Sequence, residues 1–183
     1  SGTGCGDRTM SGRSSATTRL TQLALLTTVA LIIFVIEANI PPLTSVPGVK
    51  MGLANIVTLS VFYLYGRKDA LMVLLTRVVL GAFASGQIMT LPYSLSGGLL
   101  CFLVCALLFP LFPLKRLWLL SVIGAIFHNI GQIGIAIAIT GTPEILWYLP
   151  VLMVSGIISG FFTGHCAQYL LTHMKKLGRG GRF

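Results

Sequence analysis

Long apolar runs alternate with short polar breaks along most of the chain. A helix of about 20 apolar residues spans the hydrocarbon core of a bilayer, so these runs predict membrane helices. The breaks between them carry proline, glycine or charged residues, which favour turns. The second run is short for a full span and the last is long. The six predicted helices cover residues 20–38, 51–65, 70–88, 95–113, 117–139 and 146–173.

The composition agrees with this pattern. Apolar residues make up 55% of the chain and charged residues only 9%, with a mean hydropathy of +0.90. A soluble domain usually has about 25% charged residues. We therefore predict an all-α integral membrane protein with six transmembrane helices.

The formal net charge of +9 reflects membrane topology and does not indicate a nucleic-acid partner. If successive helices alternate in direction, nearly all the basic residues fall on one side of the membrane. Of the thirteen lysines and arginines, only Lys50 falls on the opposite side, and Arg77 lies inside a predicted helix. Basic residues collect in cytoplasmic loops, so both termini are predicted to be cytoplasmic. The charge would then attract anionic lipid head groups of the bilayer.

One membrane domain is predicted between two polar ends. Residues 1–19 are rich in glycine, serine and threonine and predict a flexible tail without the features of a signal peptide. Residues 20–175 would form the six-helix domain. Residues 176–183 would form a short basic tail.

Arg77 lies near the middle of the third apolar run and is the first indication of a functional site. A charged side chain inside a bilayer costs at least ~2.5–3.5 kcal/mol, so it should face a polar cavity, a counter-charge or backbone carbonyls. Glu37, Asp69 and Glu144 are the acidic candidates, and the sequence places none of them beside Arg77. An anionic ligand is one interpretation. The alternative is that Arg77 reaches the cytoplasmic head groups or pairs with Asp69 or a helix-end carbonyl.

The outer end of the second predicted helix is a second candidate region. The first helix ends at Glu37 and Asn39 on this side, and Gly48, Lys50, Gly52 and Asn55 should cluster near the outer surface. The first turn of a helix presents unpaired N–H groups and a positive dipole end, which favour an anionic or hydrogen-bonding ligand. Lys50 as a simple interfacial anchor is the alternative.

The fifth predicted helix carries three polar side chains within about one turn. His128 and Gln132 are four residues apart and share one face, with Asn129 beside them. They are candidate ligand contacts, although hydrogen bonds between membrane helices would explain them equally well.

The sequence offers no set of catalytic or metal-binding residues. The four acidic residues are widely separated, so no carboxylate cluster can hold Mg²⁺ against a diphosphate. The chain also lacks a phosphate-binding loop and a nucleophile elbow. Cys101 and Cys105 share a helical face without histidine partners, which favours packing over metal binding. We predict a protein that is not an enzyme and needs no metal or cofactor.

Residues 48–86, GVKMGLANIVTLSVFYLYGRKDALMVLLTRVVLGAFASG, resemble the heptaprenyl diphosphate synthase component I family, also called the Gx transporter family. The six short helices and the Pro/Gly-rich first outer loop add to this resemblance. The family is in turn similar to the substrate-binding S components of energy-coupling factor (ECF) vitamin transporters.

The resemblance implies an S-component-like bundle in a bacterial plasma membrane that captures a small molecule from outside. It also implies a transmembrane coupling subunit and two cytoplasmic ATPases as partners. Small residues of the first helix would contact the coupling subunit. The matching residues are Ala24, Thr28 and Ala30, which depart from the pattern of two alanines four apart.

Two functions are left open. In the first, the chain is a transporter subunit whose loop 39–50 covers an outward-facing cavity. In the second, it is a noncatalytic membrane component of heptaprenyl diphosphate or quinone metabolism, including quinone-dependent electron transfer, and binds a prenyl or quinone-like ligand. The predicted ligand contacts are the same in both: Lys50, Asn55, Arg77, Tyr93, His128, Asn129 and Gln132.

Overall fold

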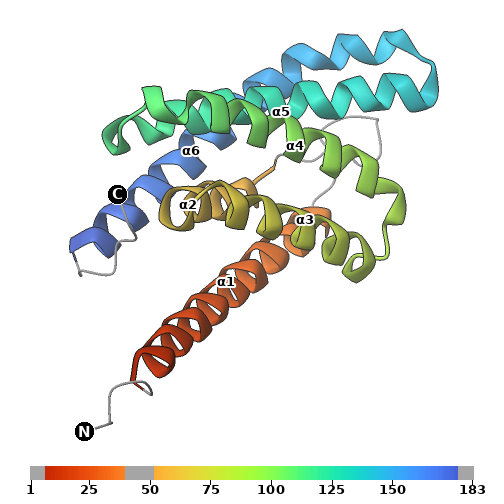
Figure 1. Cartoon of the computed structure of the whole chain (residues 1–183). Helices are drawn as coiled ribbons and strands as arrows, with labels where there is room; N and C mark the ends of the chain where they lie inside the picture. The colour runs from red at the N-terminus through yellow and green to blue at the C-terminus, as the bar shows by residue number, and fades with distance from the viewer. Residues whose placement is uncertain (1–6, 40–51, 177–183) are drawn as a thin grey trace, which may run out of the picture.

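A computed structural model describes residues 7–39 and 52–176, and within these residues the protein is entirely helical (Figure 1). Six α-helices lie in the described ranges, in agreement with the prediction. They are α1 (Asp7–Asn39), α2 (Asn55–Tyr65), α3 (Arg67–Ala84), α4 (Leu91–Leu108), α5 (Leu117–Thr140) and α6 (Leu149–Lys176). Short 3-10 turns at Ile88–Thr90, Phe109–Leu111, Leu114–Arg116 and Pro143–Tyr148 connect or extend them.

Four of the apolar segments are long enough to cross a membrane. These are Thr17–Glu37, Ile88–Leu111, Leu114–Thr140 and Pro143–His173. By contrast, α2 has 11 residues and rises only about 16 Å, roughly half the thickness of the hydrocarbon core. The helix α3 has 18 residues, with charges at its first turn and at Arg77. The protein is therefore a multi-pass membrane protein with four long apolar helices and two shorter ones.

The beginning of α1 differs from the sequence prediction. Residues 7–19, predicted to belong to a flexible tail, continue the first membrane helix, which begins at Asp7. Adding a residue to an existing helix is much easier than nucleating one. This segment contains no proline to stop it. The polar composition of the segment therefore did not locate the helix end.

Small residues bring α4, α5 and α6 close together. A Cβ atom added at Gly131 of α5 would lie 2.9 Å from the backbone oxygen of Ser96 in α4. On α6, Gly160 and Gly164 press against the backbone of α5 at Val122 and Trp118. The hydroxyl of Ser96 donates to the Gly131 carbonyl at 2.8 Å. Close backbone approach with added polar contacts is typical of packing between membrane helices.

The helix α1 packs on α2 and α3, and its N-terminal part leads away from the other helices (Figure 1). Near its C-terminal end, the ring of Phe34 lies directly over Gly81 of α3. One turn earlier, Ala30 is fully buried in an apolar cluster with residues of α2 and α3. These contacts place the C-terminal end of α1 beside the middle of the bundle.

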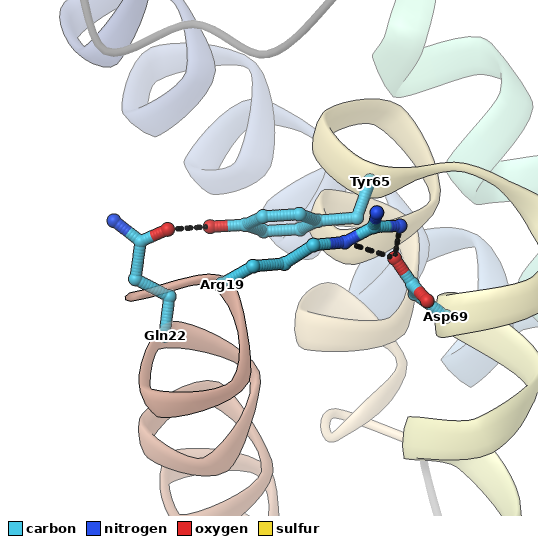
Figure 2. A network of polar contacts seen from close by, with 4 residues as sticks. All are labelled: Arg19, Gln22, Tyr65 and Asp69. Atoms are coloured by element: carbon cyan, nitrogen blue, oxygen red, sulfur yellow. Dashed lines mark hydrogen bonds and ion pairs between the residues drawn. The ribbon is translucent and has the colours of Figure 1, made fainter. Parts of the chain in front are cut away.

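Two polar contacts join the N-terminal half of α1 to the end of α2 and the start of α3 (Figure 2). The guanidinium of Arg19 donates to the carboxylate of Asp69 at the start of α3, with Nε at 3.2 Å. The hydroxyl of Tyr65, the last residue of α2, donates to Gln22 Oε1 at 2.7 Å. Asp69 is therefore held at the predicted cytoplasmic end of α3, away from Arg77.

The close packing of α6 on α5 leads to a first prediction. Gly160→Ala should lower the free energy of unfolding by about 1–3 kcal/mol, because the new Cβ would lie 2.8 Å from Val122 Cα and the helices must separate. The measurement is thermal unfolding of the protein in detergent. Gly134→Ala on α5, where no atom lies within 4 Å of the added Cβ, is the matched control. Equal melting temperatures for Gly160→Ala and Gly134→Ala would contradict this account of the packing.

The Arg19–Asp69 ion pair should contribute little to stability. The side chain of Arg19 is 55% exposed, and exposed ion pairs contribute about 0.2–1 kcal/mol. A double-mutant cycle with Arg19→Ala and Asp69→Ala should therefore give a coupling energy in that range that decreases with added salt. A coupling energy that exceeds this range and does not respond to salt would show that the pair is shielded from solvent.

Candidate functional site

A small buried cavity lies where α1, α3, α4 and α5 converge. Polar and charged side chains from all four helices face it, together with Gly52, which precedes α2. The lining residues are Phe34, Glu37, Gly52, Arg77, Val78, Ser94, His128 and Gln132. Residues from distant parts of the sequence thus build one polar site inside an otherwise apolar bundle.

Arg77 is the central residue of this site. Its side chain is only 3% exposed, and its Nη2 atom donates a hydrogen bond to Asn55 Oδ1 at the start of α2. The Nε atom has no hydrogen-bond partner among the described residues. Since Arg77 is buried within the bundle and Asp69 binds Arg19, the alternative in which Arg77 extends to the head groups or pairs with Asp69 is wrong.

Glu37 supplies the negative charge that the sequence did not place beside Arg77. Its side chain is 5% exposed, lines the same cavity and interacts electrostatically with the Arg77 guanidinium. The backbone N–H of Gly52 donates to Glu37 Oε1. The φ of Gly52 is +76°, and a Cβ there would lie 3.0 Å from both Asn55 Nδ2 and the His128 ring. Glycine at position 52 thus lets the backbone reach the carboxylate.

His128 and Gln132 reach the cavity from α5 and are both buried. Gly97 of α4 makes room for them, because a Cβ at that position would lie 2.8 Å from the His128 carbonyl oxygen and 2.9 Å from Gln132 Cγ. Ser94 lines the cavity one turn before Gly97 on the same helix. The α4–α5 contact therefore places these two side chains opposite Glu37 and Arg77.

Some predicted ligand contacts lie elsewhere. Asn129 points to α6, where its Nδ2 donates to the carbonyl of Leu152, so it joins two helices and does not line the cavity. Tyr93 packs in an apolar cluster with residues of α5 and α6. Lys50 and most of the loop 39–50 lie outside the described residues. Among the predicted residues, the structure brings together Asn55, Arg77, His128 and Gln132.

The sequence analysis did not include Glu37 and Ser94 among the ligand contacts. Glu37 gave a usable signal, because it is a carboxylate at the end of an apolar run in a chain with only four acidic residues. A carboxylate inside a membrane should face a polar partner, as an arginine does. Ser94 gave no such signal, since serine is common in membrane helices as a packing residue.

The cavity is small in this conformation. The space open to the centre of a water molecule is about 10 Å³, which is about enough for a single water. Its chemistry is that of hydrogen bonding and charge pairing. No group of three or more histidine, cysteine, aspartate or glutamate side chains suited to a metal ion occurs in residues 7–39 and 52–176. A larger molecule could bind only if the surrounding helices separated.

The predicted partner contacts on α1 fall into two groups. Ala24 and Thr28 lie on an exposed face, with the Thr28 hydroxyl donating to the Ala24 carbonyl at 2.9 Å. Ala30 is 0% exposed and faces α2 and α3, so it is not available to a partner protein. The prediction for Ala30 failed because the rotation of α1 about its axis depends on tertiary packing.

Comparison with known proteins gives one match. The sequence model described as heptaprenyl diphosphate synthase component I matches residues 26–170, which is well over half of the chain. No curated protein and no solved structure matches the chain significantly. The matched range includes α3, α4, α5 and the C-terminal part of α1, which surround the cavity.

The charge pair at the cavity leads to a prediction about stability. Arg77→Gln should lower the free energy of unfolding by about 3–5 kcal/mol, because it leaves the Glu37 carboxylate buried without its cation. Glu37→Gln combined with Arg77→Gln should recover much of that loss. Unfolding in detergent is the measurement, and Thr76→Ala, at an exposed position on α3, is the control. Additive losses in the double variant would show that the two charges do not stabilise each other.

Proposed function

We propose that this chain, which belongs to the heptaprenyl diphosphate synthase component I family, is the membrane-embedded substrate-binding subunit of an ECF-type transporter. The observation that carries the proposal is the buried polar cavity around Arg77. Charged side chains at membrane depth are costly and usually mark the path or binding site of a substrate. Glu37, Asn55, His128 and Gln132 would contact the substrate together with Arg77.

The chemistry of the cavity supports binding and not catalysis. Arginine, histidine and amide side chains can hold a small molecule by hydrogen bonds. The sequence has no phosphate-binding loop with which to hydrolyse ATP. Energy for releasing the substrate on the other side of the membrane would therefore come from ATPase subunits in the cytoplasm, transmitted through a coupling subunit.

The small size of the cavity fits a state of such a subunit in which the helices have not separated to admit a substrate. The helix α1 contributes Phe34 and Glu37 to the lining and packs mainly on α2 and α3. Movement of α1 would open the cavity without disturbing the close packing of α4, α5 and α6. In the proposed topology, with both termini in the cytoplasm, this opening faces outward.

The exposed face of α1 would bind the coupling subunit. Ala24 and Thr28 lie one turn apart there and carry small side chains, which permit a partner helix to approach closely. Of the three residues predicted to contact the coupling subunit, only Ala24 and Thr28 are accessible, since Ala30 is buried.

The family description favours a second candidate function. In it, the chain is a noncatalytic membrane component of heptaprenyl diphosphate or quinone metabolism, and the same cavity binds a prenyl or quinone-like molecule. The partner would then be a synthase or a redox protein instead of a coupling subunit.

Purification of the tagged full-length protein from its native membrane, with mass spectrometry of the retained proteins, tests these functions. We expect a coupling subunit and ATPases to be retained. Ala24→Leu combined with Thr28→Leu should reduce their recovery at least about tenfold, because leucine prevents close approach of the partner helix. Ala138→Leu, at an exposed position of α5, should retain them.

Retention of a prenyl synthase or redox subunit, without ATPases and regardless of the α1 substitutions, would overturn the transporter function and support the metabolic one.

A further inference from the structure

A second cavity lies between α2 and α4, and its character is almost wholly apolar. Its walls come from Asn55, Thr58 and Phe62 on α2 and from Gly98, Cys101 and Cys105 on α4, with neighbouring apolar side chains. The space open to the centre of a water molecule is about 20 Å³. This cavity is separate from the polar cavity around Arg77, and none of its residues has a role in the site described above except Asn55.

Asn55 connects the two cavities. Its side chain stands in the wall of the apolar cavity and accepts the hydrogen bond from Arg77, which lines the polar one. The residues that line the apolar cavity run from Asn55 to Phe62 on α2 and from Gly98 to Cys105 on α4. Seven helical steps correspond to about 10 Å of wall. Asn55 therefore stands between the polar cavity and an apolar slot whose walls have that length.

The backbones of α2 and α4 are not in extensive contact, because α2 packs mainly on α1, α3 and α6 while α4 packs mainly on α3 and α5. Their side chains nevertheless pack together. The Phe62 ring lies 5.7 Å from Phe102 in α4 and 4.9 Å from Phe109 just after it, measured between ring centroids. A molecule in the slot would therefore have to displace these rings.

Thr58 is an anomaly in this slot. Its side chain is buried, with 8% of the residue exposed, and its hydroxyl has no hydrogen-bond partner among the described residues. A buried polar group without a partner destabilises a protein, so a molecule that offered Thr58 a hydrogen bond would bind there favourably. The hydroxyl lies in the wall of the cavity, where a bound molecule would meet it.

The charges of the polar cavity restrict the part of a molecule that could bind there. Among the described lining residues, Arg77 is the only arginine or lysine and Glu37 the only acidic residue, so their charges balance. A diphosphate would bring several negative charges beside the Glu37 carboxylate, with one guanidinium to offset them. A group that both donates and accepts hydrogen bonds, and that has no net charge, matches the cavity better.

We propose that the site takes an amphipathic molecule that spans both cavities. A polar head without net charge binds among Arg77, Glu37, His128 and Gln132, and an apolar body of about 10 Å lies between α2 and α4. The inference rests on the proposed function, whose substrate class it names. It holds for a substrate that is transported and for one that is delivered to a metabolic partner.

Geraniol and geranyl diphosphate are matched probes, because they share a ten-carbon apolar body and differ in the charge of the head. Binding to the full-length protein in nanodiscs, measured by native mass spectrometry, should be at least about tenfold tighter for geraniol, since the diphosphate is repelled by Glu37. Thr58→Leu should weaken geraniol binding at least about tenfold by filling the slot. Thr76→Leu, on the exposed face of α3, should leave it unchanged.

Three results would overturn the inference. These are tighter binding of the diphosphate, equal binding of geraniol to wild type and Thr58→Leu, and no binding of either probe. Thr58→Leu replaces an unpaired hydroxyl with an apolar group, so its melting temperature should not fall, and this separates a blocked slot from a damaged fold. The capture of coupling and ATPase subunits does not depend on these probes, so failure here leaves the transporter function to its own test.

Discussion

The need to hold the Arg77 guanidinium inside an apolar bundle is the constraint on which the rest of this structure depends. A positive charge at membrane depth is stable only if polar groups replace the water it has lost. Here the end of α1 supplies Glu37 and the beginning of α2 supplies Asn55. Both groups come from helix ends that flank the same loop, so binding the arginine also ties the first two helices to the third. The hydrogen bond from Gly52 to Glu37 completes this connection from the backbone.

The helices α4, α5 and α6 satisfy a different requirement, which is the close approach of their backbones to one another. Glycines at the α4–α5 and α5–α6 contacts remove the side chains that would keep the backbones apart, and these three helices form the most closely packed part of the protein. The helix α2 is too short to follow them across the membrane and packs on α1, α3 and α6. Its face toward α4 packs through side chains such as Phe62 and Phe102 and leaves a small apolar cavity, which is the slot.

These two features give a binding site with separate polar and apolar parts. The polar part holds a balanced pair of charges and buried hydrogen-bonding side chains, and the apolar part begins at the asparagine that binds the arginine. This arrangement of hydrogen-bonding and apolar side chains is suited to the recognition of a ligand. Within the described residues, the element best placed to open the site is α1, which packs mainly on the side formed by α2 and α3.

The sequence by itself determined the helical class, the approximate helix positions and the need of Arg77 for polar neighbours, because the cost of placing a charge or an apolar run relative to a bilayer is a property of each segment alone. It also identified Asn55, His128 and Gln132 as candidate contacts. Tertiary structure alone decided that Asn129 turns to α6, that Tyr93 lies in an apolar cluster and that Ala30 is buried. It also decided that Glu37, and not Asp69, stands beside Arg77. These outcomes depend on how far each helix is rotated about its axis and which neighbour it meets. That rotation is determined by packing among small residues from distant parts of the chain, and a hydropathy pattern does not contain it.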